Sequence, residues 1–256
     1  MLGDFLSTGL GVIGLSWQSS PALSEPEEVV TDWLRQMVGL SSAWSGVIND
    51  TASTNTLVAL LCARERTTDY GLARGGLQSE DTPLVVYVSS HSHSSVEKAA
   101  LLAGFGRDNL RFIDHDDDFA MKPDLLDAAI ARDIAAGHRP CAIVATTGTT
   151  TTTAFDPISA IADIAKVRGV WLHVDAAMAG SAMILPECRW MWDGVEGAED
   201  LVLGFEGGTD QPHQRVDHHD DRGEQHPVRA PVGLGRCLDS GDHFGPFGRG
   251  VFSPRR

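Results

Sequence analysis

The feature that most constrains the fold is a series of short apolar runs that alternate with segments of helical periodicity. The runs LVVYV (84–88), CAIVAT (141–146) and VWLHV (170–174) are apolar at nearly every position rather than at every second one. A strand of this kind must be buried on both faces, which is typical of a parallel sheet with helices on each side. The pattern therefore predicts an α/β fold with a mostly parallel sheet covered on both faces.

The segments around these runs carry helix signals. Ser24 and Glu27 have the spacing of a capping box, with Pro26 in the first turn, and Ser94 and Glu97 repeat that spacing. Apolar residues then recur every three or four positions. We expect helices at 24–38, 55–65, 94–105, 123–137 and 157–169, and a further short strand at 110–113.

The alternation stops near Gly204, where the composition also changes. Residues 204–256 contain no lysine, isoleucine, methionine, asparagine, tryptophan or tyrosine, and hold half of the ten histidines. Because neither a helical nor an alternating pattern is present, we expect a disordered tail with too little apolar surface to fold. A histidine-rich metal tail around DHHDD (217–221) is the alternative, but no second group stands at ligand spacing, so no metal site is expected.

Charge and cysteine spacing restrict the partners and the compartment. The net charge of −15 argues against nucleic acid or an anionic membrane as a partner. No run reaches the roughly 18 apolar residues of a membrane span, and the first residues lack the basic start of a signal peptide. The four cysteines are widely spaced without a CxxC pair, which favours reduced thiols in a cytoplasmic protein.

Polar residues follow the apolar runs where a parallel sheet binds its ligands, beyond the carboxyl ends of the strands. His93 follows the first run, threonines 146–153 follow the second, and Asp175 ends the third. NDTASTNT (49–56) precedes a helix and offers hydroxyls and backbone N–H groups to a phosphate. Each feature alone has an ordinary structural explanation. Together they suit pyridoxal phosphate, which combines a phosphate, a flat ring and a ring nitrogen that must stay protonated.

Five blocks of the chain are distinctive enough to be compared with known families: GLSWQSSPALSEPEEVVTDWL (14–34), GVINDTASTNTLVALLCAR (46–64), SHSHSSVEKAA (90–100), IVATTGTTTTTAFDPI (143–158) and WLHVDAAMAGSAMILPECRWMWDGVEGAEDLVL (171–203). In this order they resemble the group II pyridoxal-phosphate-dependent decarboxylases, in particular their aromatic-L-amino-acid decarboxylase branch. The resemblance covers about residues 4–203. It implies that residues 1–203 are a partial, incomplete large domain of a fold type I transferase, which acts as a carboxy-lyase on an aromatic amino acid within a homodimer.

The resemblance also implies roles for individual residues around the cofactor. Asp175 pairs with the ring nitrogen and keeps it protonated, so that the ring accepts electrons during decarboxylation. Ala177 packs on one face of the ring, and His93 stacks on the other, where it also contacts the substrate. Thr149 lies near the ring, and Thr51, Ala52 and Ser53 lie at the phosphate. Ile13, Gly14 and Leu15 reach into the substrate pocket of the partner subunit.

The chain departs from the family after LVL (201–203). The family continues with a histidine–lysine motif whose lysine forms the Schiff base, whereas this chain continues with GFEGGTDQPHQ (204–214). Its three lysines, Lys98, Lys122 and Lys166, do not match that position. The C-terminal small domain and an N-terminal segment of the family also have no counterpart.

These departures make residues 204–256 non-homologous to the family and suggest, as a hypothesis, a frameshift product. We expect the chain to be inactive as it stands. The alternatives are a non-catalytic cofactor-binding or assembly protein, and a broken gene product that does not fold stably.

Overall fold

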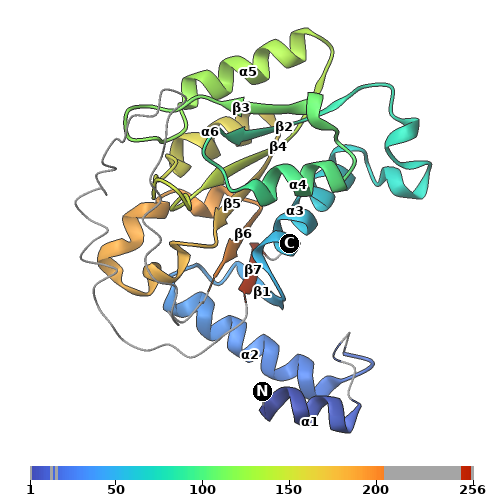
Figure 1. Cartoon of the computed structure of the whole chain (residues 1–256), viewed down its shortest axis with the longest axis vertical. Helices are drawn as coiled ribbons and strands as arrows, with labels where there is room; N and C mark the ends of the chain where they lie inside the picture. Colours follow the sequence, from blue (N-terminus) through green and yellow to red (C-terminus); the bar gives the residue numbers. More distant parts are fainter. Residues whose placement is uncertain (1, 12–13, 15–16, 205–248, 255–256) are drawn as a thin grey trace, which may run out of the picture.

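A computed structural model describes residues 2–11, 14, 17–204 and 249–254. Within these residues the strands form one seven-stranded sheet in the order β1-β7-β6-β5-β4-β2-β3 (Figure 1). All neighbouring strands from β3 to β6 pair in parallel, and β7 is antiparallel to both β6 and β1. The strands are β1 (Trp44–Asn49), β2 (Leu84–Ser89), β3 (Leu110–Ile113), β4 (Arg139–Thr146), β5 (Trp171–Ala176), β6 (Asp200–Leu203) and β7 (Arg249–Pro254).

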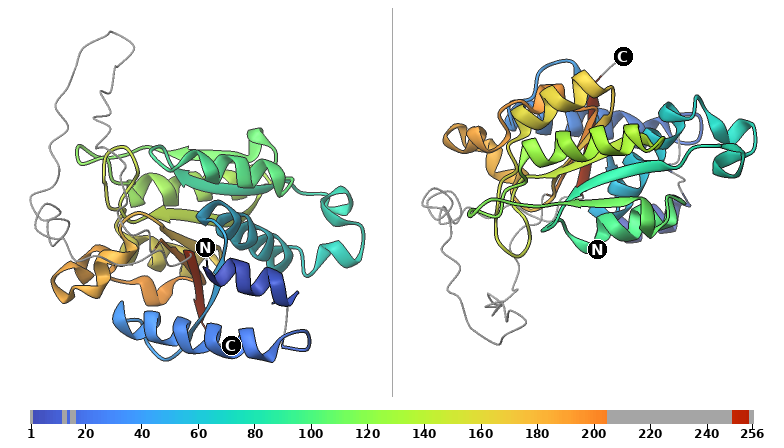
Figure 2. Two further views of the ribbon diagram at one scale, coloured as in Figure 1. Left: turned by 60° about the horizontal axis from the view of Figure 1, so that its bottom comes forward. Right: turned by 90° about the horizontal axis from the view of Figure 1, so that it is seen from above.

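Helices cover both faces of this sheet, as Figures 1 and 2 show. One core lies between the sheet and α5 and α6, and a second lies between the sheet and α3 and α4. The mostly parallel, doubly covered α/β fold is therefore confirmed. The helices are α1 (Leu2–Leu10), α2 (Pro21–Met37), α3 (Ala52–Thr67), α4 (Ser94–Leu102), α5 (Pro123–Ala135) and α6 (Ile158–Arg168).

Each central strand supplies side chains to both cores. In β2, Val85 and Tyr87 join the core beneath α5 and α6, while Val86 and Val88 join the core beneath α3 and α4. All four side chains are buried. This double burial is the reason that the run is apolar at successive positions rather than at alternating ones.

The two predicted capping boxes are wrong. Helix α2 begins at Pro21, after Ser20, and therefore contains Ser24 within its first turns. Pro21 stands at the start of the helix, where a proline loses no hydrogen bond, and Pro26, which was expected in the first turn, lies inside the helix. His93, and not Ser94, caps α4, because its imidazole accepts a hydrogen bond from the N–H of Ser95.

The structure also contains strands that the sequence pattern did not predict. Strands β1 and β6 are short, and β1 carries a glycine and polar ends, so neither gives a clear periodic signal. Residues 249–254 form β7, which corrects the expectation of disorder throughout 204–256 for this segment. The histidines of the proposed metal tail, together with Ile13 and Leu15, lie outside the described residues. No helix in the described part of the chain is long and apolar enough to cross a membrane.

Candidate active site

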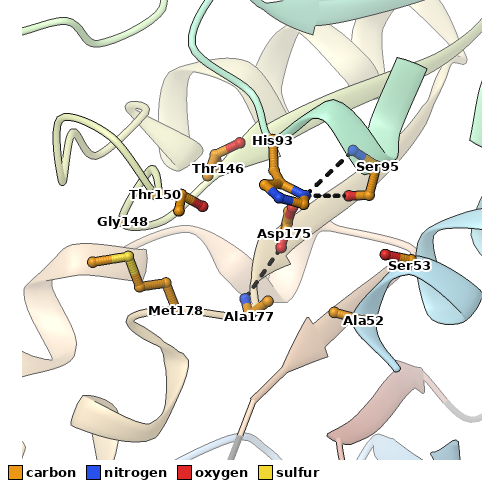
Figure 3. Close-up of a pocket in the computed structure, with 10 residues that line it drawn as sticks. All are labelled: Ala52, Ser53, His93, Ser95, Thr146, Gly148, Thr150, Asp175, Ala177 and Met178. Atoms are coloured by element: carbon orange, nitrogen blue, oxygen red, sulfur yellow. Dashed lines mark hydrogen bonds between the residues drawn. The ribbon is translucent and has the colours of Figure 1, made fainter. Parts of the chain in front are cut away.

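A pocket of about 260 Å³ lies at the carboxyl ends of the parallel strands (Figure 3). Strand β5 brings Asp175 to it, β4 brings Thr146, the turn after β2 brings His93, and the N-terminus of α3 lies beside them. The polar clusters that follow three different strands in the sequence thus meet at one site. The lining residues are Ala52, Ser53, His93, Ser95, Thr146, Gly148, Thr150, Asp175, Ala177 and Met178.

Asp175 is the acid of the pocket. Leu172 and Val174 of the same strand pack into the core on the α5 and α6 side, so Asp175 faces the opposite side of the sheet. Its side chain is only 6% exposed, and its Oδ1 accepts a hydrogen bond of 3.1 Å from the N–H of Ala177. A carboxylate that is buried but opens onto a pocket is suited to accept a hydrogen bond from a cationic donor on a ligand.

The small residues that follow Asp175 permit close packing behind the pocket. A Cβ atom at Gly180 would collide with the side chain of Leu203, and one at Gly204 would collide with the carbonyl oxygen of Ala177. The segment after β5 can therefore lie directly against the end of β6. Ala177, the small residue at the pocket itself, leaves room for a flat group beside the acid.

His93 has a defined tautomer when its ring is neutral. Its Nδ1 accepts a hydrogen bond of 3.3 Å from the N–H of Ser95 and lies 2.8 Å from the hydroxyl Oγ of the same serine. A nitrogen that accepts from a backbone N–H carries no proton, so the neutral ring is protonated at Nε2. The imidazole is thereby oriented by the first turn of α4 while it lines the pocket (Figure 3).

The N-terminus of α3 provides the predicted anion-binding element. Ala52 and Ser53 line the pocket, and the first N–H groups of a helix have no partners within it. Thr51 does not line the pocket. Its hydroxyl accepts a hydrogen bond of 3.1 Å from the N–H of Thr54, so this residue caps the helix and positions its first amides.

Within the threonine run, the structure places a different residue at the pocket from the one expected. Thr149 is buried, and its hydroxyl lies 2.6 Å from that of Thr152 and accepts a hydrogen bond of 3.0 Å from the N–H of Ala154. This side chain therefore stabilises its own loop. Thr146 and Thr150 line the pocket in its place.

A buried carboxylate fixes the base of this loop. Asp156 accepts hydrogen bonds from the N–H groups of Met121, at 2.7 Å, and Thr146, at 2.8 Å. Burial raises the pKa of Asp156 to about 6, although the two backbone hydrogen bonds oppose that change. Asp156 therefore holds the backbone of Thr146, a residue that lines the pocket.

None of the three lysines lines the pocket. Lys98 is exposed on α4 and lines a neighbouring groove that also contains Ser53 and His93. Lys122 precedes the first residue of α5, and Lys166 lies in the last turn of α6. Lys98 is thus a surface residue beside the pocket and not part of its lining.

The sequence matches the pyridoxal-dependent decarboxylase conserved domain over residues 1–203. The chain belongs to this decarboxylase family. It is 44% identical to the aromatic-L-amino-acid decarboxylase of Bos taurus over 78% of this chain and 43% of that protein. It is 41% identical to the phenylacetaldehyde synthase of Arabidopsis thaliana over 79% of this chain and 42% of the relative.

Solved structures agree with this assignment. A crystal structure of Oryza sativa TDC with PLP and tryptamine is 37% identical, with a TM-score of 0.73 over 79% of this chain and 43% of that one. The chain spans less than half the length of these relatives. The resemblance to the aromatic branch and the fold that it implied are confirmed.

The family's cofactor is pyridoxal phosphate, and the described residues fit it. The buried Asp175 carboxylate has an open side toward the pocket, Ala177 leaves space beside it, and the amides of Ala52 and Ser53 lie across the same pocket. An acceptor for a ring nitrogen and donors for a phosphate are therefore both present.

Proposed function

We propose that this fold carries the cofactor-binding part of a carboxy-lyase that converts an aromatic amino acid into its amine and CO₂. The main support is the buried carboxylate of Asp175, which opens onto a pocket assembled from three strand ends and a helix N-terminus. Relatives named as aromatic-L-amino-acid and tyrosine decarboxylases support the substrate class. The phosphate and the ring would lie between α3 and Asp175.

Five of the pocket residues have a role in this proposal. Ala52 and Ser53 donate backbone N–H groups to the phosphate, and Asp175 accepts a hydrogen bond from the protonated ring nitrogen. Ala177 and His93 lie at the two faces of the ring. When bound, pyridoxal phosphate supplies an electron-accepting ring that stabilises the negative charge left at Cα as CO₂ departs. The carboxylate of Asp175 keeps that ring cationic and hence a better electron acceptor.

The complete enzyme is proposed to be a cytoplasmic homodimer. In that assembly, Ile13, Gly14 and Leu15 of one subunit would reach the substrate pocket of the other. Gly14, the described member of the three, is exposed and therefore accessible to a partner. Its location close to the exposed apolar side chains of Phe5, Leu6 and Trp17 in the sequence supports an interface at this end of the chain.

We further propose that the 256-residue chain alone does not catalyse decarboxylation. Covalent attachment of the cofactor and release of the product both require a lysine amine. The chain has three lysines, and none lines the pocket. We retain the hypothesis that residues 204–256 are a frameshift product. Sequencing the coding DNA tests it, and the hypothesis is wrong if neither other reading frame after Leu203 encodes a histidine–lysine motif.

Two assays test these proposals, the first for the role of Asp175 and the second for the inactivity of the 256-residue chain. In a chain extended after Leu203 with the family's C-terminal part, Asp175→Ala should reduce amine production by at least about a hundredfold, because a neutral ring accepts electrons poorly. Asp163→Asn, at an exposed position on α6, is the matched control and should leave the rate unchanged. Near-normal turnover of the Asp175 variant would remove this residue from the role.

The second assay uses the 256-residue chain with added pyridoxal phosphate. After borohydride reduction, peptide mapping should find no single lysine labelled stoichiometrically. An adduct mapped to Lys98, Lys122 or Lys166, together with CO₂ release from an aromatic amino acid, would contradict the proposed inactivity.

A further inference from the structure

A buried ionic cluster lies directly behind the acid of the pocket. His173 and Asp200 face each other across β5 and β6, and Nδ1 of the imidazole lies 2.7 Å from Oδ2 of the carboxylate. The other oxygen of Asp200 accepts a hydrogen bond of 2.7 Å from Nε1 of Trp171. His173 is fully buried and Asp200 is 4% exposed. Both oxygens of Asp200 are therefore engaged, and the position of its side chain is fixed from two sides.

This cluster shares a face of the sheet with Asp175. Side chains two positions apart on a strand point the same way, so His173 and Asp175 both face the α3 side of β5. Two carboxylates, Asp175 and Asp200, are thus buried on one face within adjoining strands. Without a nearby cation, this arrangement would place two desolvated negative charges together, which is strongly unfavourable.

Among the described residues, the other groups near the imidazole supply no cation that is free to balance these charges. Arg66 on α3 is paired with Glu199 at 2.6 Å and its guanidinium lies over the ring of Trp171. Burial and the charge of Asp200 raise the pKa of the Cys62 thiol on α3, which keeps it neutral. On the other side, β4 places the apolar Val144 in register with His173.

His173 can supply that cation. Its Nε2 is buried and has no hydrogen-bond partner within the described structure, so the lack of an acceptor opposes protonation there, and the surrounding charges must favour it. Burial alone would lower the pKa of His173, but the charge and hydrogen bond of Asp200, together with the charge of Asp175, raise it above its ordinary value. The ring is therefore stabilised as an imidazolium between two carboxylates.

We propose that His173 is a positioning residue for the pocket: an imidazolium, anchored by Asp200, whose charge attracts the carboxylate of Asp175 and holds it ready to receive a cationic ring nitrogen. This inference rests on the proposed function for the identity of the ligand, but the interaction between the two side chains does not depend on the ligand. The charge coupling is reciprocal. The amount by which Asp175 stabilises the cation equals the amount by which the cation stabilises the ionised Asp175.

Because the coupling between His173 and Asp175 is reciprocal, the titration of His173 reports on it. This titration can be followed by NMR of the chain labelled with ¹⁵N-histidine. At about pH 7.5, where an ordinary histidine is mostly neutral, His173 should have both ring nitrogens protonated. In Asp175→Asn, the pH at which His173 loses its proton should fall by about one pH unit, a roughly tenfold loss of proton affinity. Asp163→Asn is the matched control and should leave the titration unchanged.

His173→Gln assigns the signal by its disappearance; should that variant fail to fold, sequential assignment of the unaltered chain identifies the same signal. A neutral His173 at about pH 7.5, or a titration that is the same in Asp175→Asn, would overturn the proposal. A histidine that is bonded to Asp200 but not coupled to Asp175 would titrate at the same pH in the unaltered chain and in Asp175→Asn.

Adding a cofactor analogue to the NMR sample distinguishes a failure of this inference from a failure of the proposed function. Pyridoxine 5′-phosphate, which has no aldehyde and needs no lysine, should shift the His173 signal in the unaltered chain but not in Asp175→Asn. If the probe has no effect while the coupling between His173 and Asp175 persists, the proposed cofactor site is wrong and the positioning role stands. If the probe acts through Asp175 while the coupling is absent, the positioning role is wrong and the site stands.

Discussion

Asp156 allows the stability of the fold to be tested quantitatively against pH. Its carboxylate is 2% exposed and receives hydrogen bonds from the N–H groups of Met121 and Thr146. Its pKa is about 6 in the folded chain, compared with an ordinary value of 3.8. Since one pKa unit corresponds to about 1.4 kcal/mol, this group changes the free energy of unfolding by about 3 kcal/mol across that window.

The sign follows from where the proton is bound. Between about pH 4 and pH 6 the folded chain retains a proton on Asp156 that the unfolded chain has released. The stability contributed by this proton is therefore present at low pH and is lost as pH rises through about 6. Asp156→Asn removes the titrating group. The variant should gain about 3 kcal/mol relative to the unaltered chain between about pH 4 and pH 7.

Urea unfolding, followed by tryptophan fluorescence at several pH values, measures this change. Asparagine offers one acceptor in place of two, which adds an offset of about 1–3 kcal/mol that does not vary with pH. The pH-dependent difference, and not the absolute stability, is therefore diagnostic. Asp163→Asn, on the exposed side of α6, controls for the general loss of a negative charge. Parallel stability curves for the unaltered chain and Asp156→Asn would refute the reasoning.

Three further substitutions test the packing near the pocket, at an open turn and in the core. Gly148→Ala, at a φ of +77°, would place its Cβ 2.5 Å from that of Ala179 and should cost about 2–4 kcal/mol in urea unfolding. Gly169→Ala, at a φ of +67° with open space around it, should cost only about 1 kcal/mol, and equal losses would contradict the packing argument. Tyr87→Phe removes a 3.0 Å hydrogen bond to Asp133 and should cost about 1–2 kcal/mol in the same assay, whereas an unchanged midpoint would show that this bond contributes nothing.

The sequence predicts those parts of the fold and site that depend on burial and on strand ends. Strands β2 and β4 are apolar on both faces, and β5 is buried on both although His173 and Asp175 occupy one of them. The apolar runs therefore indicate the doubly covered sheet. Because a parallel sheet collects the residues after its strands at one edge, His93 and Asp175 could be placed together from their positions in the chain.

Other features depend on contacts that a linear pattern does not contain. Several adjacent threonines are chemically equivalent, so only the hydrogen bonds of the folded loop distinguish Thr149, which is enclosed, from Thr150, which lines the pocket. The partner of His173 is set by the register of β5 against β6, and Asp200 follows 27 positions later without any motif that links the two. Such pairings arise from tertiary structure.

The position of β7 also has a consequence for the order in which the molecule assembles. In the described sheet, β1 has β7 as its strand neighbour, and β7 follows every other strand along the chain. Residues 44–49 therefore cannot complete their backbone pairing until residues 249–254 arrive, and closing so long a loop is entropically costly and slow. Until then β1 and the adjoining side of β6 both present unpaired N–H and C=O groups. A folding intermediate of this chain would have two open strand edges, which are the surfaces through which unfinished sheets associate with one another.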